Sequence, residues 1–386
     1  IYAPFPRPQV RDNHLEDILL YSRQFFADRA SLLTVDLGID QKYKPVIQKY
    51  IKFFGAKDRT QKFYDLELEN FTKESIEVAL MSVLCKTRIA YFDEVVRVVL
   101  TDGDLEENKF LEEFDKYGLL DAFWRLCEEQ FGYTDVKPTL EKLVLTMFVT
   151  YTQRYLQGEL PPAWKSFVSY KSGNIIAFLD NLMNNVLYRE GYDELSDYVA
   201  RNLQAKTTLE SYNPESLIQC DTFEVIDHVF IKWITERLLN EDLGAKLSGK
   251  SISEICKDRR KRHFGDRYRS EYHMLESASY VIAAASYQSR DDLKDIVKQY
   301  TTNDYQIDQQ YRKFYYNYDQ LNENSHFEKI RDLVENIYTN EFLSKSVYNW
   351  NVGLKKADSS SSMPLQRNFY SKYIQSSKDR VVVIIS

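Results

Sequence analysis

The sequence is poor in residues that interrupt helices, and this scarcity is the strongest constraint on its fold. Only 12 Gly and 9 Pro occur among 386 residues, and few turn-forming residues predict long, uninterrupted elements. Within 139–156, apolar side chains recur at the spacing of one helix face, at Leu140, Leu143, Val144, Met147, Phe148 and Tyr151. We therefore predict an all-α fold, a region of several bundled helices.

The same spacing, together with capping residues, predicts helices along most of the chain. Ser251 and Glu254 have the spacing of a capping box and open one helix. The segment from Ile89 to Val99 is also predicted to be helical, because Arg97 would interrupt a buried strand. Further helices are predicted near 41–54, 73–86, 139–156, 174–188, 192–204, 223–240, 266–286, 290–301, 304–321 and 325–349.

The last residues are the exception to the helical pattern. Val381 to Ile385 form a run of β-branched apolar residues, typical of a strand buried on both faces of a parallel sheet. A single strand needs hydrogen-bonding partners. We therefore expect a strand at 380–386, the first of a C-terminal α/β domain that begins at 378–386 and continues beyond Ser386. The Pro-punctuated residues 1–10 are interpreted as the exit from an N-terminal α/β domain.

A proline pair and a serine cluster divide the chain. Pro161 and Pro162 break helical continuity, and we expect a boundary there between helical subdomains at 11–160 and 161–350. Asp358 is followed by four consecutive Ser, which are typical of a flexible linker. We place this linker at 351–377.

Composition and charge narrow the class of protein. Apolar residues make up 44% of the chain, which excludes wholesale disorder. The net charge of −7 argues against a protein that coats nucleic acid with its whole surface, although a local basic patch stays open. The four Cys are far apart and fit unpaired core thiols in a reducing cytoplasm. No apolar run reaches transmembrane length, so we expect a cytoplasmic protein with no membrane partner.

Several stretches resemble one known protein family. Arg380 to Ser386, preceded by Gln366 to Tyr370, is similar to the beginning of the PglZ domain in the alkaline-phosphatase superfamily. Other stretches resemble the type A PglZ proteins of bacterial BREX phage-defence systems, and they are Tyr2 to Pro8, Leu15 to Leu37, Arg259 to Tyr272 and Ile307 to Tyr315. The resemblance spans nearly the whole chain. In that family the residue after the terminal strand is an Asp that binds metal.

The resemblance implies that the complete protein is a metal-dependent phosphohydrolase, phosphatase-like or nuclease-like, acting in antiviral defence. Its divalent metal, zinc or a similar ion, would be held outside this chain. No catalytic or metal-binding residue is therefore predicted here, and the chain alone is predicted to be inactive. The resemblance makes the chain a helical scaffold region that positions the catalytic domain and binds other BREX components. Whether it forms an oligomer stays open.

The strongest local signal is the basic segment Lys257 to Arg269, with seven Lys or Arg against two Asp. As one continuous helix it would dock through Phe264 and Tyr268 and leave its Arg face available. The candidate contacts to DNA or to an acidic protein partner are Arg259, Arg260, Lys261, Arg262, Arg267 and Arg269. A structural, ion-paired face is the alternative interpretation. The competing hypothesis for the chain's function is a non-catalytic interaction module that binds through this segment.

Two other patterns carry weaker signals. The Tyr-rich stretch from Tyr305 to Tyr318 has the composition of a surface that stacks on unpaired bases. Such a stripe more often packs within a bundle with its hydroxyl groups bonded to partners, and we prefer that interpretation. The five His show no metal-binding spacing.

Overall fold

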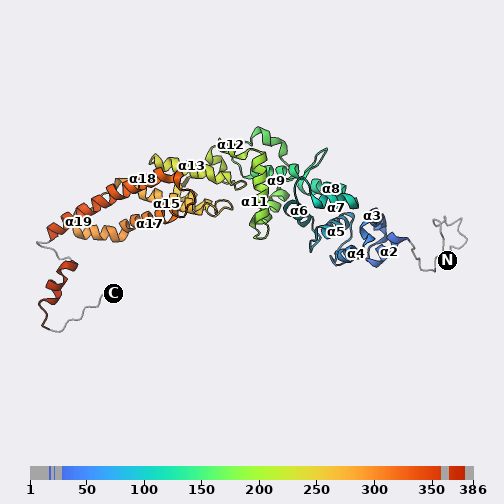
Figure 1. The fold of residues 1–386 in the computed structure, drawn as a ribbon, viewed down its shortest axis with the longest axis horizontal. Helices are drawn as coiled ribbons and strands as arrows, with labels where there is room; N and C mark the ends of the chain where they lie inside the picture. Colours follow the sequence, from blue (N-terminus) through green and yellow to red (C-terminus); the bar gives the residue numbers. More distant parts are fainter. Residues whose placement is uncertain (1–16, 19–20, 22–27, 358–364, 379–386) are drawn as a thin grey trace. The chain divides into compact units, whose positions relative to one another are not determined.

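The computed structural model describes residues 17–18, 21, 28–357 and 365–378, and over these residues the protein is mostly helical (Figure 1). The predicted all-α fold is therefore confirmed for this part of the chain. The predicted strand at 380–386 and the predicted exit segment at 1–10 lie outside the described residues.

The chain separates into two compact units. The first consists of the described residues up to Arg154 together with Ala163–Val199, and the second consists of Tyr155–Pro162 and the described residues from Ala200 onward. This division differs from the boundary expected at the proline pair. Residues after Pro162 return to the first unit because their helix at Ser172–Asn184 packs against the helix at Leu120–Phe131.

The first unit is built from helices and helical turns. They are α2 (Arg29–Asp36), η2 (Gln41–Tyr43), α3 (Lys44–Lys49), η3 (Phe53–Gly55), α4 (Lys57–Tyr64), α5 (Lys73–Cys85), α6 (Phe92–Thr101), α7 (Lys109–Tyr117), α8 (Leu120–Phe131), α9 (Leu140–Tyr155), η4 (Pro162–Phe167), α10 (Ser172–Asn184) and α11 (Arg189–Asn202). The helices predicted near 73–86 and over the Val-rich segment correspond to α5 and α6. The apolar face predicted for 139–156 is buried along α9.

The core of the first unit contains a buried carboxylate. Glu77 lies on α5, of which most residues are buried, and its side chain is 1% exposed. The Tyr50 hydroxyl donates a hydrogen bond of 2.6 Å to Glu77 Oε1, and Arg125 Nη2 from α8 lies 2.6 Å from Oε2. A buried charge needs such partners. The Tyr50–Glu77–Arg125 network therefore ties three helical segments of this unit together.

The second unit contains helices, helical turns and one small hairpin. Its elements are α12 (Ala205–Leu209), η5 (Pro214–Leu217), α13 (Val225–Leu239), β1 (Lys246–Leu247), β2 (Lys250–Ser251), α14 (Ile252–Arg259), α15 (Arg269–Ile282), η6 (Ala283–Ser286), α16 (Leu293–Gln299), η7 (Tyr300–Asp304), α17 (Tyr305–Tyr318), η8 (Ser325–Phe327), α18 (Glu328–Asn336), η9 (Ile337–Leu343), α19 (Ser344–Ala357), η10 (Gln366–Asn368) and η11 (Tyr370–Ile374). The predicted linker at 351–377 is thus partly helical, since α19 continues to Ala357 and η10 and η11 follow.

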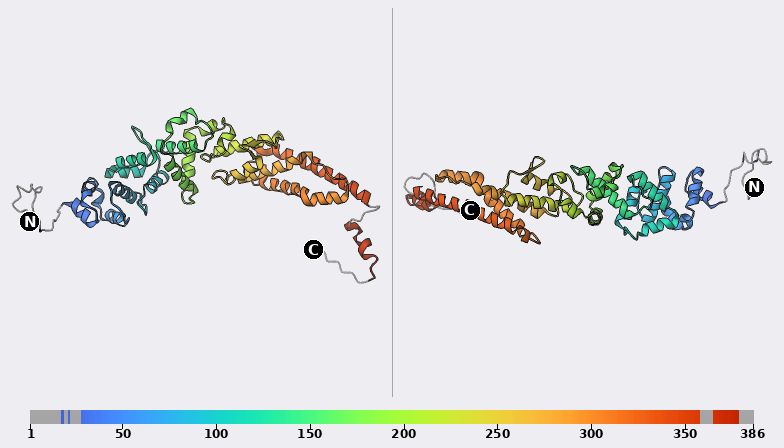
Figure 2. Two further views of the ribbon diagram at one scale, coloured as in Figure 1. Left: turned by 180° about the vertical axis from the view of Figure 1, so that it is seen from behind. Right: turned by 90° about the horizontal axis from the view of Figure 1, so that it is seen from above.

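Helix α15 is the centre of the second unit. It packs most extensively against α17 and also contacts α13, α14 and α18 (Figure 2). Its inward face includes Tyr272, Met274, Leu275 and Ala278, which are all fully buried. Residues on α14 and at the start of α15 are therefore held on a rigid support.

Two local features of the second unit were not predicted from the sequence. The antiparallel strands β1 and β2 form a hairpin, in which Gly249 adopts a φ of +79° that favours glycine. Segments η7 and η9 are π-helical rather than α-helical. A π-helical turn shifts the register of a helix face, so a strict 3.6-residue period does not describe 290–349.

The Tyr-rich stretch packs within the second unit, as preferred. Phe314 and Tyr318 are buried, and the rings of Tyr311 and Tyr338 stack with centroids 3.7 Å apart. The Tyr338 hydroxyl donates a hydrogen bond of 2.8 Å to Asp308. The four Cys are buried and unpaired, which confirms the expectation of core thiols.

Candidate functional site

The basic segment is not one continuous helix, so the predicted arrangement of its faces is wrong. Helix α14 begins at Ile252, after the predicted capping box at its N-cap Ser251, and ends at Arg259, and α15 begins ten residues later at Arg269. The chain turns between them. A side chain at Gly265 would place its Cβ 1.9 Å from the carbonyl oxygen of Arg259, so only glycine allows this close approach.

Arg259, predicted to face solvent, is buried and 2% exposed. Its Nε and Nη2 atoms each donate a hydrogen bond of 2.8 Å to one carboxylate oxygen of Asp227, and Nη1 donates a bond of 2.8 Å to the carbonyl oxygen of Cys220. The Tyr272 hydroxyl donates a further bond of 2.6 Å to Asp227. Arg259 is therefore a structural residue that joins α13, α14 and α15, and it is unavailable to a ligand.

The electrostatics of this network follow from its burial. Burial alone would lower the pKa of Arg259, but Asp227 raises it overall, and the guanidinium stays charged. Asp221 Oδ1 lies 3.7 Å from Arg259 Nη2, and burial raises the pKa of Asp221 above its usual value despite this cation. Burial also raises the pKa of Tyr272, and the charge of Asp227 adds to the effect.

Arg262 and Arg267 face the segment that precedes α13. Arg262 Nη2 donates a hydrogen bond of 2.9 Å to Gln219 Oε1. Arg267 Nη1 lies 3.1 Å from Glu224 Oε2, and its guanidinium sits over the Phe264 ring at 5.1 Å. Both side chains are thus engaged by residues outside the group of remaining cations.

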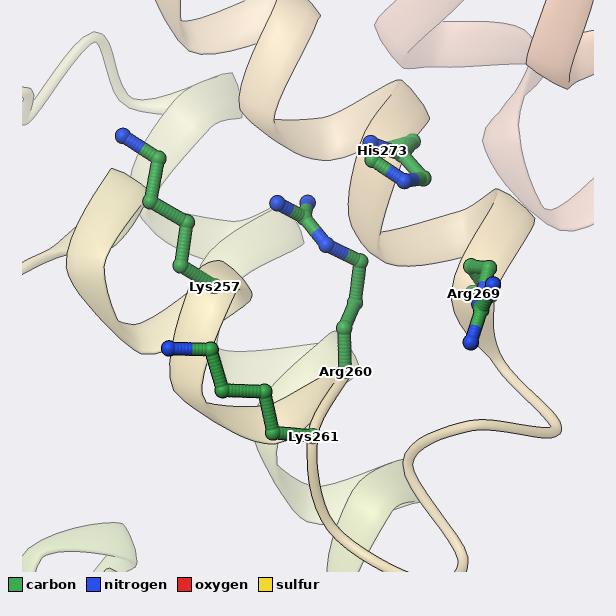
Figure 3. A pocket seen from close by; sticks show the side chains of 5 residues that line it. All are labelled: Lys257, Arg260, Lys261, Arg269 and His273. Atoms are coloured by element: carbon green, nitrogen blue, oxygen red, sulfur yellow. The ribbon is translucent and has the colours of Figure 1, made fainter.

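The other predicted cations gather around one hollow of about 340 Å³, which is lined by Lys257, Arg260, Lys261, Arg269 and His273 (Figure 3). Lys257 is on α14, and Arg260 and Lys261 directly follow it. Arg269 and His273 are one turn apart on α15. In Figure 3 the Arg260 side chain extends between the two Lys on one side and Arg269 and His273 on the other.

Two carboxylates offset part of the positive charge around this hollow, which we call the basic hollow. Glu276 accepts a hydrogen bond of 2.7 Å from Arg260 Nη1 and lies 3.4 Å from Lys257 Nζ. Asp266 pairs with Arg269. Four cations against two carboxylates leave a local excess of two positive charges. Burial would raise the pKa of Glu276, but hydrogen bonds from Arg260 and Ser253 lower it overall, so Glu276 stays ionised.

His273 completes the lining without adding charge at neutral pH. Partial burial, followed by repulsion from the Arg260 guanidinium, lowers the pKa of His273 below its ordinary value. A neutral imidazole still offers one hydrogen-bond donor. The basic hollow therefore offers an anion several positive charges and one neutral hydrogen-bond donor.

The prediction from sequence found part of this lining. Arg260, Lys261 and Arg269 were among the candidate residues and do meet in the hollow, whereas Arg259, Arg262 and Arg267 do not line it. Lys257 belongs to the basic segment but was not among the candidates. His273 was missed, although its position four residues after Arg269 places both side chains on one helix face.

Metal-binding side chains do not cluster in the described residues. No three His, Cys, Asp or Glu residues among them come close enough to hold a metal ion. The divalent metal implied by the family resemblance therefore does not fit the part of the chain that the structure describes. We assign no catalytic step to these residues.

The chain is similar in sequence to two known proteins. It is 31% identical over 401 aligned residues to "Alkaline phosphatase-like protein PglZ" of Bacillus cereus (strain H3081.97), and 25% identical over 428 to "Alkaline phosphatase-like protein BrxZ" of Escherichia coli O9:H4 (strain HS). Each alignment covers 100% of this chain. The chain is a homologue of PglZ.

This PglZ homology covers about half the length of the curated relatives, 46% of the first and 48% of the second. No family model and no solved structure matches the chain. Among the described residues, no helix is both long enough and apolar enough to cross a membrane.

Proposed function

We propose that this chain is the helical scaffold region of a metal-dependent phosphohydrolase of the PglZ kind, which acts in bacterial antiviral defence. The observation that carries the proposal is the alignment of the entire chain with two proteins described as alkaline phosphatase-like. Enzymes of the alkaline-phosphatase superfamily use bound divalent metal to activate a nucleophile and stabilise charge on phosphate oxygens. In our proposal, residues outside this chain supply those ligands.

The described residues support a mechanical role rather than a chemical one. Each of the two units has its own core, and each core is tied by a buried carboxylate that is bonded to an Arg and a Tyr. Such networks fix helices in one arrangement. In the proposed function these helices position the catalytic domain and bind other components of the BREX defence system.

A hydrolysis assay tests this proposal. The substrates are a phosphodiester reporter, a phosphomonoester reporter and plasmid DNA, with added zinc or manganese. The proteins compared are this chain and a longer form that also contains the remaining half found in the relatives. We expect activity from the longer form alone and its loss on chelation. Activity of residues 1–386 by themselves would contradict the scaffold role, and an inactive longer form would contradict the phosphohydrolase assignment.

A second candidate function is a non-catalytic interaction module. The observation that favours it is the basic hollow, where four cations meet two carboxylates on a protein whose net charge is −7. A positive site on an acidic protein is not explained by overall composition. The two candidates are compatible, because a scaffold can also carry a binding site.

A further inference from the structure

The basic hollow has the properties of a site for a polymeric anion. The side chains of Lys257 and Arg269 are 57% and 63% exposed, whereas that of Arg260 is only 14% exposed. Lys257 and Arg269 therefore lie at the open rim of the hollow, and the Arg260 guanidinium is partly buried in it. A site for a small free anion would enclose it with buried donors, and this open arrangement suits a ligand that extends beyond the hollow.

The positive charge is not cancelled within the protein. Arg260 and Lys257 share one carboxylate, Glu276, and Arg269 pairs with Asp266. Lys261 is exposed and has no ion-pair partner among the described residues. Neutralising a polymer's phosphates here would release the cations condensed on that polymer, which favours association at low salt.

The chemistry of the lining favours nucleic acid over an acidic protein as the ligand. All the side chains that line the hollow among the described residues are Lys, Arg or His. Protein interfaces are usually centred on apolar and aromatic anchors, and none lines this hollow. Interfaces with nucleic acid are more polar and much more positively charged. The lining also lacks the Phe, Tyr and Trp on which unpaired bases stack.

We propose that the hollow formed by Lys257, Arg260, Lys261, Arg269 and His273 binds the phosphate backbone of nucleic acid without reading its sequence. Arg260 and Arg269 supply planar guanidinium groups that suit phosphate oxygens, and the two Lys supply point charges. His273 supplies a neutral hydrogen-bond donor. This site does not depend on hydrolysis by the longer protein, so it and the proposed function can fail separately.

The test uses residues 1–386 and fluorescently labelled DNA of two unrelated sequences, each as a single strand and as a duplex. Fluorescence anisotropy measures the dissociation constant between 50 and 200 mM KCl. The variant Lys257→Glu/Lys261→Glu reverses two charges in the hollow. The matched control, Lys232→Glu/Lys329→Glu, makes the same change in net charge at two exposed Lys of the second unit that do not line the hollow. Thermal unfolding followed by circular dichroism checks that both variants are folded.

We expect equal affinity for the two sequences and a loss of affinity of more than about tenfold in the hollow variant at low salt. The slope of log affinity against log salt should fall by about 1.8 for duplex or 1.4 for single strands, the values for two lost phosphate contacts. The control variant should change both the affinity and the salt slope less than the hollow variant does. Equal losses in both variants, or no DNA binding by the parent chain, would overturn the proposal.

Two competitors identify the ligand class. If polyglutamate displaces the DNA more effectively than unlabelled DNA does, the hollow is a site for acidic protein and our proposal is wrong. Millimolar inorganic phosphate could instead remove all DNA binding, while the slope of log affinity against log salt stays near the value for one phosphate contact. In that case the hollow holds a single free phosphate, and the assignment to a polymeric anion is wrong. Displacement by unlabelled DNA of any sequence, but by neither competitor, supports the proposal.

Discussion

At the residue scale, burial decides what each charged side chain can do. Arg259 and Arg260 are neighbours in the sequence, yet Arg259 is enclosed by Asp227, Tyr272 and the Cys220 carbonyl, whereas Arg260 reaches the basic hollow. Removing one partner of a buried pair leaves the other charge uncompensated. The same substitution should therefore lower the free energy of unfolding more at the buried Arg259 than at the more exposed Arg262.

We expect Arg259→Met to lower the free energy of unfolding of the second unit by about 3–5 kcal/mol, because Asp227 would be left buried and unpaired. Arg262→Met is the control, since Arg262 is bonded to Gln219 near the surface, and it should cost no more than about 1 kcal/mol. Urea unfolding followed by circular dichroism measures both. Equal costs for the two variants would show that Arg259 is not the structural residue its contacts indicate.

Gly265 provides a second test of the turn between α14 and α15. A methyl group there would meet the Arg259 carbonyl oxygen at 1.9 Å, so the backbone must shift in Gly265→Ala. We expect a loss of about 1–3 kcal/mol, as for other overpacked sites. Gly173→Ala, on α10 with nothing within 4 Å of the added atom, should change stability by less than about 1 kcal/mol. The comparison fails if Gly265→Ala is as well tolerated as Gly173→Ala in urea unfolding.

At the element scale, the start of α14 depends on a capping box whose strength varies with pH. Ser251 accepts a hydrogen bond from the Glu254 backbone, and Glu254 accepts bonds from the backbone and hydroxyl groups of Ser251. These bonds lower the pKa of Glu254 below its usual value. A carboxylate with a lowered pKa in the folded state stabilises the fold above its unfolded pKa and loses that effect as pH falls.

Ser251→Ala should therefore cost about 1 kcal/mol near pH 7, the usual cost of losing an N-cap. The difference from the parent should shrink as pH falls from the ordinary pKa of a Glu through the lower pKa of Glu254 in the folded parent, because the carboxylate is then protonated and no longer strengthens the cap. Urea unfolding at a series of pH values between 7 and 3.5 measures the difference. Ser270→Ala, which removes a hydroxyl group from α15, away from the cap of α14, is the control. A difference that grows toward acidic pH would contradict the capping role.

The elements also show which parts of the fold could be predicted from sequence. The extents of α5 and α9 and the start of α14 follow from capping residues and 3.6-residue spacing, which are local properties. The burial of Arg259 could not be predicted in this way, because its partner Asp227 is 32 residues away on α13. The continuous basic helix was predicted wrongly because the close approach at Gly265 depends on tertiary structure. The π-helical segments likewise depart from the period on which helix prediction rests.

The candidate site, like the fold, could be predicted only in part from the sequence. A local excess of Lys and Arg pointed to the segment that contributes to the hollow, and Arg260, Lys261 and Arg269 do line it. Which cations remain available depends on acidic partners on other elements, such as Glu224 for Arg267. Sequence spacing alone does not contain that information, so the prediction included three Arg that are engaged elsewhere.

At the scale of the whole molecule, the two units repeat one structural device. Glu77 is bonded to Tyr50 and Arg125 in the first unit, as Asp227 is bonded to Tyr272 and Arg259 in the second. Each network lies entirely within its own unit. A compact unit with its own core can in principle unfold by itself, so the two networks offer separate ways to weaken each half of the chain.

We therefore expect the chain to unfold in urea in two steps, each controlled by one network. Glu77→Gln removes the charge that Arg125 and Tyr50 engage. It should lower the urea midpoint of only one step, which corresponds to a loss of about 1–3 kcal/mol in the free energy of unfolding of that step. Arg259→Met should shift only the other step, and the double variant should show both shifts added together. Tryptophan fluorescence and circular dichroism follow the two steps. A single transition that both substitutions shift equally would contradict this prediction, because the two units would then unfold together.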